Sequence, residues 1–390
     1  MKKIFYNVKI VTPTTVVEDK ALLVENGKIS ALLDDFKTVE AERIDCRGNY
    51  LLAGFIDVHV HGGGGADFMD GEPEAMETAI ATHLAHGTTT IYPTTMAAEL
   101  SEIDKTFSVF REVKRRGKIK ANAPGLHLEG PFISPAMCGA QRKDLIISPM
   151  EKEIAWLKDN ADIVSRITCA PEEKGVLEMA EQLLPAGISF SLGHTMATYE
   201  QAEEAFEKGF TAITHLYSAT SGFHKVNQRV HIGVTQAAYG IEGIYAELIG
   251  DGRHVPKELL RLVVKCKGAD KVCVVTDAMR AAGTDLTESY LGAKEPQNRV
   301  IIEDGVAKLP DRSFYAGSIG TMDRALRFAV QMAGFSLSTA SEFLSLTPAK
   351  LMGISEAKGS LEVGKDADMV LMDEELNVEG VFVGGENVVS

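Results

Sequence analysis

Two histidines separated by one residue follow an apolar run near the start of the chain. Residues 54–58 are largely apolar, His59 and His61 end the run, and four consecutive glycines come next. On a β-strand, residues i and i+2 point to the same side, so both imidazole rings can face one point. The glycines allow a sharp turn directly after the pair. This arrangement predicts half of a metal site, which needs further ligands from other strands.

Further residues able to bind a metal or carry a proton follow other apolar runs. They are Glu129, His194, His215, His254 and Asp277. The C-terminal ends of parallel strands meet at one face of a barrel, so we expect these side chains to converge there with the first pair. Such nitrogen and oxygen ligands suit Zn²⁺, Fe²⁺, Mn²⁺, Co²⁺ or Ni²⁺. A single histidine after a strand is often only structural, but seven such residues in one chain favour metal chemistry.

Other histidines lead to different interpretations. His127 shares a strand face with Glu129, and we expect it to point into the barrel and orient a ligand or substrate. His83 and His86 lie at helical spacing just before Gly87, which favours a role at a helix end or on the surface.

Hydrolysis is the chemistry that this set of residues favours. A catalytic metal lowers the pKa of a bound water toward about 7. A nearby carboxylate can take the proton of the attacking water and pass it to a leaving nitrogen. Asp277, at the end of the last predicted strand, suits that role. The alternative is that Asp277 caps the helix that follows it.

The middle of the chain has to position these residues, and it alternates strand-like and helix-like segments. Apolar strands that alternate with helices predict a parallel sheet of class α/β. Eight such units favour a closed (β/α)₈ TIM-type barrel over a doubly wound open sheet. Helices are expected at 74–86, 199–208 and 256–266. The barrel strands are expected at 51–60, 88–93, 125–129, 163–170, 188–192, 212–215, 244–249 and 271–276.

Both ends of the chain are predicted to form short strands. These are expected at 4–11, 21–25, 28–33, 369–372 and 378–383. Asn26-Gly27 is a strong hairpin signal between two of them. Each end is too short to fold alone, so we expect one small β-sandwich made from both. The predicted division is 1–53 for the N-terminal part of the sandwich, 54–350 for the hydrolase barrel and 351–390 for the C-terminal part.

The composition of the 390 residues is ordinary for a soluble globular protein, with 45% hydrophobic and 24% charged residues. No apolar run approaches the roughly 18 residues of a membrane span. The formal net charge of −15 argues against nucleic acid or an anionic membrane as the main partner. The five cysteines are scattered and form no zinc or disulfide pattern, which indicates a reducing, cytoplasmic location.

Several longer motifs resemble the N-acetylglucosamine-6-phosphate deacetylases, a group within the amidohydrolase superfamily. Besides residues 54–65, the similar segments are Leu128-Glu129-Gly130-Pro131-Phe132, Leu192-Gly193-His194-Thr195, Thr214-His215-Leu216-Tyr217, Asp251-Gly252-Arg253-His254-Val255, Thr276-Asp277-Ala278-Met279, Ala316-Gly317-Ser318 and Met322-Asp323. The resemblance covers nearly the whole chain. It implies a (β/α)₈ barrel with a β-sandwich made from both chain ends.

The resemblance also implies roles for individual residues. The expected metal ligands are Glu129, His194 and His215, with His59 and His61 for a second ion. One or two divalent ions per subunit are therefore expected. Asp277 would act as the general base and then as the general acid, and His254 would contact a sugar hydroxyl. The positions expected to line the sugar phosphate are Ala140, Ser218, Ala219, Tyr315, Ala316, Gly317 and Ser318.

Three features depart from the family pattern. Ser218 stands where the family usually has asparagine, and Gln141 stands where it usually has a histidine that hydrogen-bonds near the scissile amide. The phosphate loop, residues 222–233, is a few residues longer than usual. In the family a partner subunit supplies the arginine that binds the phosphate. We therefore expect a homodimer in which Arg229, with Lys225 as the alternative, contacts the substrate phosphate.

The resemblance implies a metal-dependent hydrolase that removes the acetyl group from an N-acetyl amino sugar 6-phosphate. N-acetylglucosamine 6-phosphate, giving glucosamine 6-phosphate and acetate, is the favoured substrate. N-acetylgalactosamine 6-phosphate or an unphosphorylated sugar is the alternative. Hydrolysis of another linear or cyclic amide is less favoured, because Glu129 stands where relatives acting on cyclic amides often use a carbamylated lysine. A non-catalytic scaffold is least favoured, because no expected ligand or base is missing.

Overall fold

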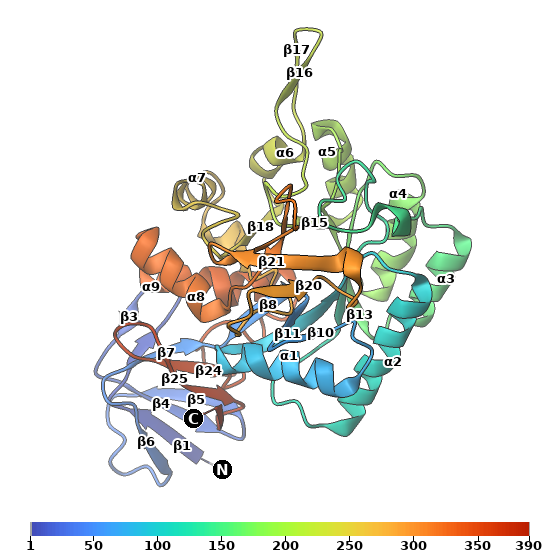
Figure 1. Cartoon of the computed structure of the whole chain (residues 1–390). Helices are drawn as coiled ribbons and strands as arrows, with labels where there is room; N and C mark the ends of the chain where they lie inside the picture. Colours follow the sequence, from blue (N-terminus) through green and yellow to red (C-terminus); the bar gives the residue numbers. More distant parts are fainter. Residues whose placement is uncertain (1, 390) are drawn as a thin grey trace.

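A parallel sheet of eight strands forms the centre of the computed structural model, which describes residues 2–389 (Figure 1). The strands are neighbours in the order in which the chain makes them. They are β8 (Phe55–Val60), β11 (Thr88–Thr95), β12 (Leu126–Glu129), β13 (Val164–Cys169), β14 (Ser189–Leu192), β15 (Phe210–Ile213), β18 (Tyr245–Ile249) and β19 (Val272–Val275). All eight expected barrel strands are therefore present.

The barrel closes between its first and last strands. The backbone N–H of Asp277 donates to the carbonyl of His59 at 2.9 Å, and Val60 pairs in parallel with Ala278. Below this seam, the Thr276 hydroxyl donates to the buried Asp57 carboxylate at 2.5 Å. These contacts join β8 to the segment after β19, so the expected closed barrel is confirmed and the open sheet is excluded.

Helices cover the outside of the barrel between the strands (Figure 1). They are α1 (Pro73–Ala85), α2 (Leu100–Arg116), α3 (Glu151–Asp159), α4 (Val176–Leu183), α5 (Tyr199–Glu207), α6 (Val234–Gly240), α7 (Lys257–Lys267), α8 (Met322–Arg327), α9 (Leu337–Ser341) and α10 (Thr347–Leu351). The three expected helices correspond to α1, α5 and α7. In α2, Ile103, Phe107, Phe110 and Val113 are buried, which is the apolar stripe that a barrel-covering helix needs.

Two sheets from the chain ends pack into the expected sandwich. One has the order β5–β4–β1–β6 and the other β26–β25–β24–β7–β2–β3. Their strands are β1 (Lys2–Tyr6), β2 (Lys9–Val11), β3 (Val16–Val17), β4 (Ala21–Glu25), β5 (Lys28–Leu33), β6 (Glu42–Asp45), β7 (Tyr50–Ala53), β24 (Met369–Met372), β25 (Val378–Val383) and β26 (Glu386–Val389). Phe5 of one sheet meets Phe382 of the other edge to face, at 4.9 Å between ring centroids.

Two expected strands are each broken into two. The strand expected at 4–11 is interrupted at Asn7, whose φ of 52° is left-handed, so β1 and β2 join different sheets. The strand expected at 51–60 is interrupted at Gly54, where a Cβ would lie 2.0 Å from the Thr89 hydroxyl. At Gly54 the chain leaves the sandwich and enters the barrel. The division of the chain at residues 53 and 350 stays a prediction.

Smaller elements complete the C-terminal face of the barrel. An antiparallel sheet follows β19, with β20 (Glu288–Tyr290), β21 (Arg299–Glu303), β22 (Val306–Lys308) and β23 (Tyr315–Ser318). A glycine-flanked hairpin of β16 (His224–Val226) and β17 (Arg229–His231) projects from the barrel (Figure 1). Two short antiparallel strands, β9 (Gly62–Gly63) and β10 (Ala66–Asp67), follow the first histidine pair. Within residues 2–389, no helix has the length and apolar character needed to cross a membrane.

Candidate metal centre and active site

Three of the expected ligands converge at the mouth of the barrel. The Nε2 atoms of His194 and His215 lie 3.1 Å and 2.8 Å from Oε1 of Glu129, and 3.2 Å from each other. All three residues are buried. Two imidazole nitrogens and one carboxylate oxygen aimed at one point form a donor set that fits a divalent metal.

The pair at the end of β8 forms a second group around the same carboxylate. His59 Nε2 lies 3.2 Å from His61 Nε2 and 3.4 Å from Glu129 Oε1. His61 Nε2 lies 3.4 Å from Glu129 Oε2. Glu129 is therefore shared by two groups of possible ligands, as a carboxylate between two metal positions would be.

Hydrogen bonds on the far side of the rings fix which nitrogen faces the centre. Nδ1 of His194 lies 2.7 Å from the Met137 carbonyl, and Nδ1 of His215 lies 3.0 Å from the Ser218 carbonyl. A carbonyl only accepts, so each Nδ1 must carry the proton. The Nε2 atoms of His194 and His215 are then left with free lone pairs, which is the tautomer that a metal ligand requires.

Negative charge dominates this buried centre. Burial alone would lower the pKa of His59, but Glu129, Asp277 and Glu247 outweigh it and hold that pKa well above its usual range. The same balance raises the pKa of His61 to about 9, through Asp277 and Glu129. Burial would raise the pKa of Glu129, yet His59 and His194 hold it well below its usual range. A site that favours protonated histidines beside ionised carboxylates is also one that favours a bound cation.

Left-handed backbone turns direct three of these side chains inward. His194, His215 and Asp277 each lie two residues beyond a barrel strand, with φ values of 49°, 31° and 45°. Residues other than glycine rarely adopt this conformation, and such positions concentrate at functional sites. The strand expected to end at His215 stops two residues earlier because the chain turns here.

Asp277 lies beside the histidine pair. Its Oδ1 is 3.2 Å from His61 Nε2 and 3.6 Å from His59 Nε2. Burial would raise its pKa, but these two rings lower it, so the carboxylate is ionised and able to accept a proton. Residues 278–287 form a bridge and turns rather than a helix, so Asp277 is not the helix cap considered as its alternative role.

A cavity of about 430 Å³ opens over the centre. The expected residues that line it are His61, Glu129, Ala140, Gln141, His194, His215, Ser218, Ala219, His254, Asp277, Tyr315 and Gly317. Ala316 and Ser318 alternate with Tyr315 and Gly317 along β23 and are buried instead. The Ser318 hydroxyl donates to the Thr276 carbonyl at 2.6 Å. Arg229 lies on the exposed hairpin and does not line the cavity of its own chain.

Gln141 connects the cavity wall to the shared carboxylate. Its side-chain N–H donates to Glu129 Oε2 at 2.8 Å, and its side-chain oxygen accepts from the Ala97 N–H at 2.8 Å. Gln141 therefore fixes the orientation of Glu129 and lies within 3.4 Å of His194 Nε2. His254 is held similarly at the opposite wall, with Nδ1 2.7 Å from Asp251 Oδ2 and its ring 4.8 Å from that of Tyr315.

The structure also brings in residues that the sequence analysis did not identify. Glu247 on β18 places Oε1 2.7 Å from His59 Nδ1 and Oε2 2.6 Å from Arg166 of β13. The same Oε1 accepts from the His215 N–H at 3.2 Å. His127, which the sequence analysis already expected inside the barrel, packs its ring edge-on against His59 at 4.7 Å and hydrogen-bonds Thr168. A lone charge inside an apolar strand, as in Glu247 and Arg166, was the signal available in the sequence, because such groups are seldom buried unless paired.

Comparison with known proteins identifies related enzymes over the whole chain. The sequence model of the amidohydrolase family matches residues 50–388. An N-acetylglucosamine-6-phosphate deacetylase of Lysinibacillus sphaericus is 32% identical over 383 residues, which is 98% of this chain and 96% of the relative. An N-acetylgalactosamine-6-phosphate deacetylase of Escherichia coli O157:H7 is 30% identical and covers 97% of each chain. The crystal structure of N-acetylglucosamine-6-phosphate deacetylase from Pasteurella multocida superposes with a TM-score of 0.92 at 34% identity, over 100% of both chains.

Proposed function

Because the chain belongs to the amidohydrolase family, we propose that it is a metal-dependent deacetylase of N-acetyl amino sugar 6-phosphates. The favoured substrate is N-acetylglucosamine 6-phosphate, which would give glucosamine 6-phosphate and acetate. The observation that carries this proposal is Glu129, shared by two histidine pairs next to the ionised Asp277. Relatives and neighbours over the full length that bear the name of this activity support the substrate class.

In the proposed hydrolysis, some residues of this chain bind metal and another transfers a proton. Glu129, His194 and His215 would hold one divalent ion, and His59 with His61 a second. When bound, the ion supplies positive charge that acidifies water and polarises the amide carbonyl. Asp277 takes the proton of the attacking water and returns it to the nitrogen as the C–N bond breaks.

Substrate contacts are proposed for the walls of the cavity. His254, oriented by Asp251, would hydrogen-bond a sugar hydroxyl. Gln141 would act near the scissile amide. The sugar phosphate would be lined by Ala140, Ser218, Ala219, Tyr315 and Gly317. Ala316 and Ser318 would support this wall through the backbone of β23. We further propose that the enzyme acts in the cytoplasm, in line with five cysteines that form no disulfide.

We propose that a homodimer completes the site. The projecting hairpin and its flanks, residues 222–233, expose the apolar side chains of Phe223, Val226 and Val230, each about half or more exposed. A second copy of the chain would cover these groups and place Arg229 at the neighbouring cavity. A guanidinium can hold a phosphate through two parallel hydrogen bonds, and Lys225 on the same hairpin is the alternative.

Acetate release tests the substrate. The purified, metal-loaded enzyme would be assayed with N-acetylglucosamine, N-acetylgalactosamine and N-acetylmannosamine, each with and without a 6-phosphate. The proposal predicts the highest kcat/KM for N-acetylglucosamine 6-phosphate. A preference for N-acetylgalactosamine 6-phosphate would move the assignment to the other sugar, and no acetate from any of the six would refute it.

Elemental analysis tests the metal centre independently of activity. The wild-type protein, reconstituted with Zn²⁺ and freed of excess ion, should retain metal, and His215→Ala should retain less. His224→Ala is the matched control, since His224 is exposed on the hairpin. Equal metal content in all three proteins would contradict the assignment of His215.

A further inference from the structure

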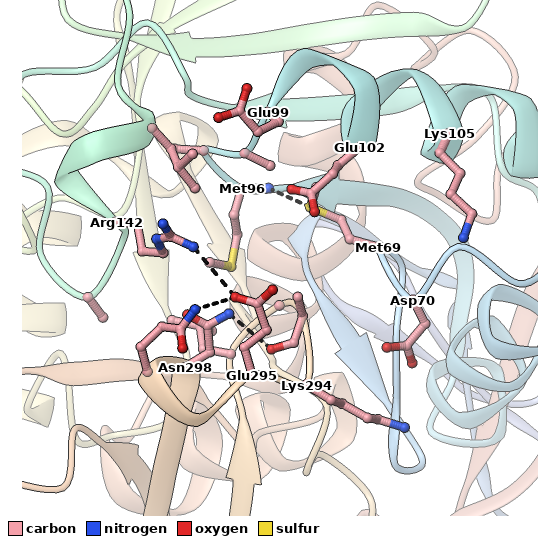
Figure 2. A pocket seen from close by; sticks show the side chains of 18 of the residues that line it. Met69, Asp70, Met96, Glu99, Glu102, Lys105, Arg142, Lys294, Glu295 and Asn298 are labelled. Atoms are coloured by element: carbon pink, nitrogen blue, oxygen red, sulfur yellow. Dashed lines mark hydrogen bonds and ion pairs between the residues drawn. The ribbon is translucent and has the colours of Figure 1, made fainter.

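A second, larger cavity shares part of its lining with the active-site cavity. Figure 2 shows this second cavity. Its volume is about 710 Å³. It lies between the first turns of α1 and α2, the loop that follows β12 and the turn at residues 291–298. Of the residues assigned above to the metal centre or to the substrate, only Ala140 also lines this space.

Three residues border both cavities. Met96, Ala140 and Leu291 line both of them. The thioether of Met96 lies against Gly292, where a Cβ would be 3.7 Å from Met96 Cε. Methionine is unbranched, with three rotatable bonds, and adapts to the space around it. Of the three residues, Met96 therefore has the side chain that can move aside most readily.

The strand order of the barrel shows which end of the substrate faces this partition. Met96 follows β11 and Gln141 follows β12, whereas Ser218 and His254 follow β15 and β18. In the eight-stranded order, β11 is four strands from β15 and β12 is four strands from β18. Ser218 and His254 thus lie across the barrel mouth from Met96, whereas Ala140 borders the partition. A carbonyl carbon over Glu129 then directs its nitrogen toward the sugar side and its acyl carbon toward Met96.

Part of the wall next to the partition is apolar. The sulfur of Met69 accepts from the Met96 N–H at 3.2 Å, and Ala97 and Ala98 follow Met96 along the cavity wall. Charged groups share the cavity lining: Figure 2 draws Glu102, Arg142 and Glu295 beside Met96, and Lys105 and Lys294 farther from it. The side chains of Met69, Ala97 and Ala98 therefore form an apolar strip along which the methylene groups of an acyl chain can pass.

We propose that the enzyme also hydrolyses amino sugar 6-phosphates carrying a longer linear N-acyl group, whose chain passes Met96 into the second cavity. This rests on the proposed function. In the reaction, the water oxygen bonds to the acyl carbon, the C–N bond breaks, and the nitrogen takes the proton that Asp277 removed from the water. The products are the free amine and the corresponding carboxylate, for example butanoate in place of acetate.

The test compares N-acetyl- and N-butanoyl-glucosamine 6-phosphate by following release of the free amine. A closed acyl pocket that rejects extra methylenes discriminates by about 10–200-fold for each, and N-butanoyl adds two. Because the cavity is available, we expect the N-butanoyl compound to retain kcat/KM within about tenfold of the N-acetyl compound. Met96→Ala should raise the ratio of butanoyl to acetyl kcat/KM at least about threefold. Ala98→Leu, which narrows only the second cavity, should lower this ratio by a similar factor. Turnover of the N-acetyl compound should stay unchanged in Ala98→Leu.

Two controls make the result decisive. Met332→Ala, at a methionine that is 56% exposed, should leave the ratio as in wild type. If Ala98→Leu does not fold, Ala75→Leu on α1 narrows the same cavity. A wild-type ratio below about one in a thousand, or a ratio that Met96→Ala leaves unchanged, overturns the inference while N-acetyl hydrolysis continues. Failure to hydrolyse either compound refutes the proposed function instead.

Discussion

Replacing Glu247 by glutamine removes one negative charge from beneath the candidate metal centre and leaves its shape intact. Glu247 is fully buried. Burial would raise its pKa, but Arg166 and His59 hold that pKa at about 2, so the group is ionised at neutral pH. Glutamine keeps an oxygen that can accept from His59 Nδ1 and from the His215 N–H, the two contacts that Glu247 Oε1 makes. The substitution therefore tests charge rather than packing.

The expected loss of stability comes from Arg166, which would remain buried without its carboxylate partner. Arg166 is 1% exposed, and its guanidinium lies 2.6 Å from Glu247 Oε2. Removing one partner of a buried ion pair costs about 3–5 kcal/mol, because the other charge stays buried without compensation. Arg166 retains the Ser191 hydroxyl at 2.9 Å, but a hydroxyl does not neutralise the charge. We expect Glu247→Gln to lower the free energy of unfolding by about 3 kcal/mol.

The same substitution should weaken metal binding through His59. Carboxylates that orient a metal-ligating histidine are worth about 10–100-fold in metal affinity or activity. Urea unfolding of the metal-free protein measures stability, and competition with a fluorescent chelator measures Zn²⁺ affinity. The control Glu242→Gln makes the same change at an exposed residue and should alter neither quantity.

A double variant separates the ion pair from other effects. Arg166→Met combined with Glu247→Gln removes both charges, so it should be more stable than Glu247→Gln alone, while Zn²⁺ affinity stays low. If the free energy of unfolding of Glu247→Gln lies within about 1 kcal/mol of the wild-type value and its Zn²⁺ affinity is unchanged, Glu247 neither compensates Arg166 nor supports His59.

Three further changes test other parts of the structure. Asp277→Asn should keep its metal but lose about 10²–10⁴-fold in kcat, because an amide cannot accept the proton of water; retained metal with near-full kcat would exclude Asp277 as the base. Arg229→Ala should raise KM about tenfold or more for the phosphorylated sugar alone, and an equal loss on the unphosphorylated sugar, or a fully active monomer, would contradict the cross-subunit contact. Burial lowers the pKa of His83 to about 4, so the folded protein keeps the ring neutral while the unfolded chain protonates it below about pH 6.5. The free energy of unfolding should fall by up to about 3 kcal/mol as pH drops from 6.5 to 4. In urea unfolding, His83→Gln should flatten this fall, and the control His224→Gln, at an exposed ring, should not. An unchanged pH dependence for His83→Gln would show that burial of His83 does not cause the fall.

The sequence predicts the barrel and the main candidate ligands because their signals are local. A parallel strand buried on both faces is an apolar run, and a polar residue directly after it lies at the active face of a barrel. His59, Glu129 and His215 carry both signals, and the structure brings them together. The hairpin at Asn26-Gly27 is predictable for the same reason, since its two left-handed residues, with φ of 51° and 78°, are specified by residue type alone.

What the sequence does not predict depends on contacts between distant segments. Of the two roles expected for His83, the helix-end position is confirmed, because the residue lies in the last turn of α1. The surface position is wrong: the ring is buried, with Nε2 2.9 Å from the Gly62 carbonyl. Residue spacing along α1 could not indicate this contact, because the partner of His83 lies in a turn 21 residues earlier in the chain. Glu247 and Arg166 likewise meet only because barrel closure brings the inward side chains of β18 and β13, three strands apart, within reach of each other. Ala316 and Ser318 match a family motif, but strand alternation turns them away from the cavity.

The seam of the barrel links the fold to the proposed chemistry. Asp277 donates its backbone N–H to the His59 carbonyl, and the backbone N–H groups of His61 and Gly62 donate to the Ala278 carbonyl at 2.8 Å and 3.0 Å. The first and last barrel strands are therefore joined through the residues that carry the candidate base and two candidate ligands. The left-handed turn at Asp277 is tolerated because these bonds define it on both sides. Closing the barrel thus also places the carboxylate of Asp277 within reach of the candidate metal centre. The hydrogen bonds of this seam therefore stabilise the fold and position the candidate base.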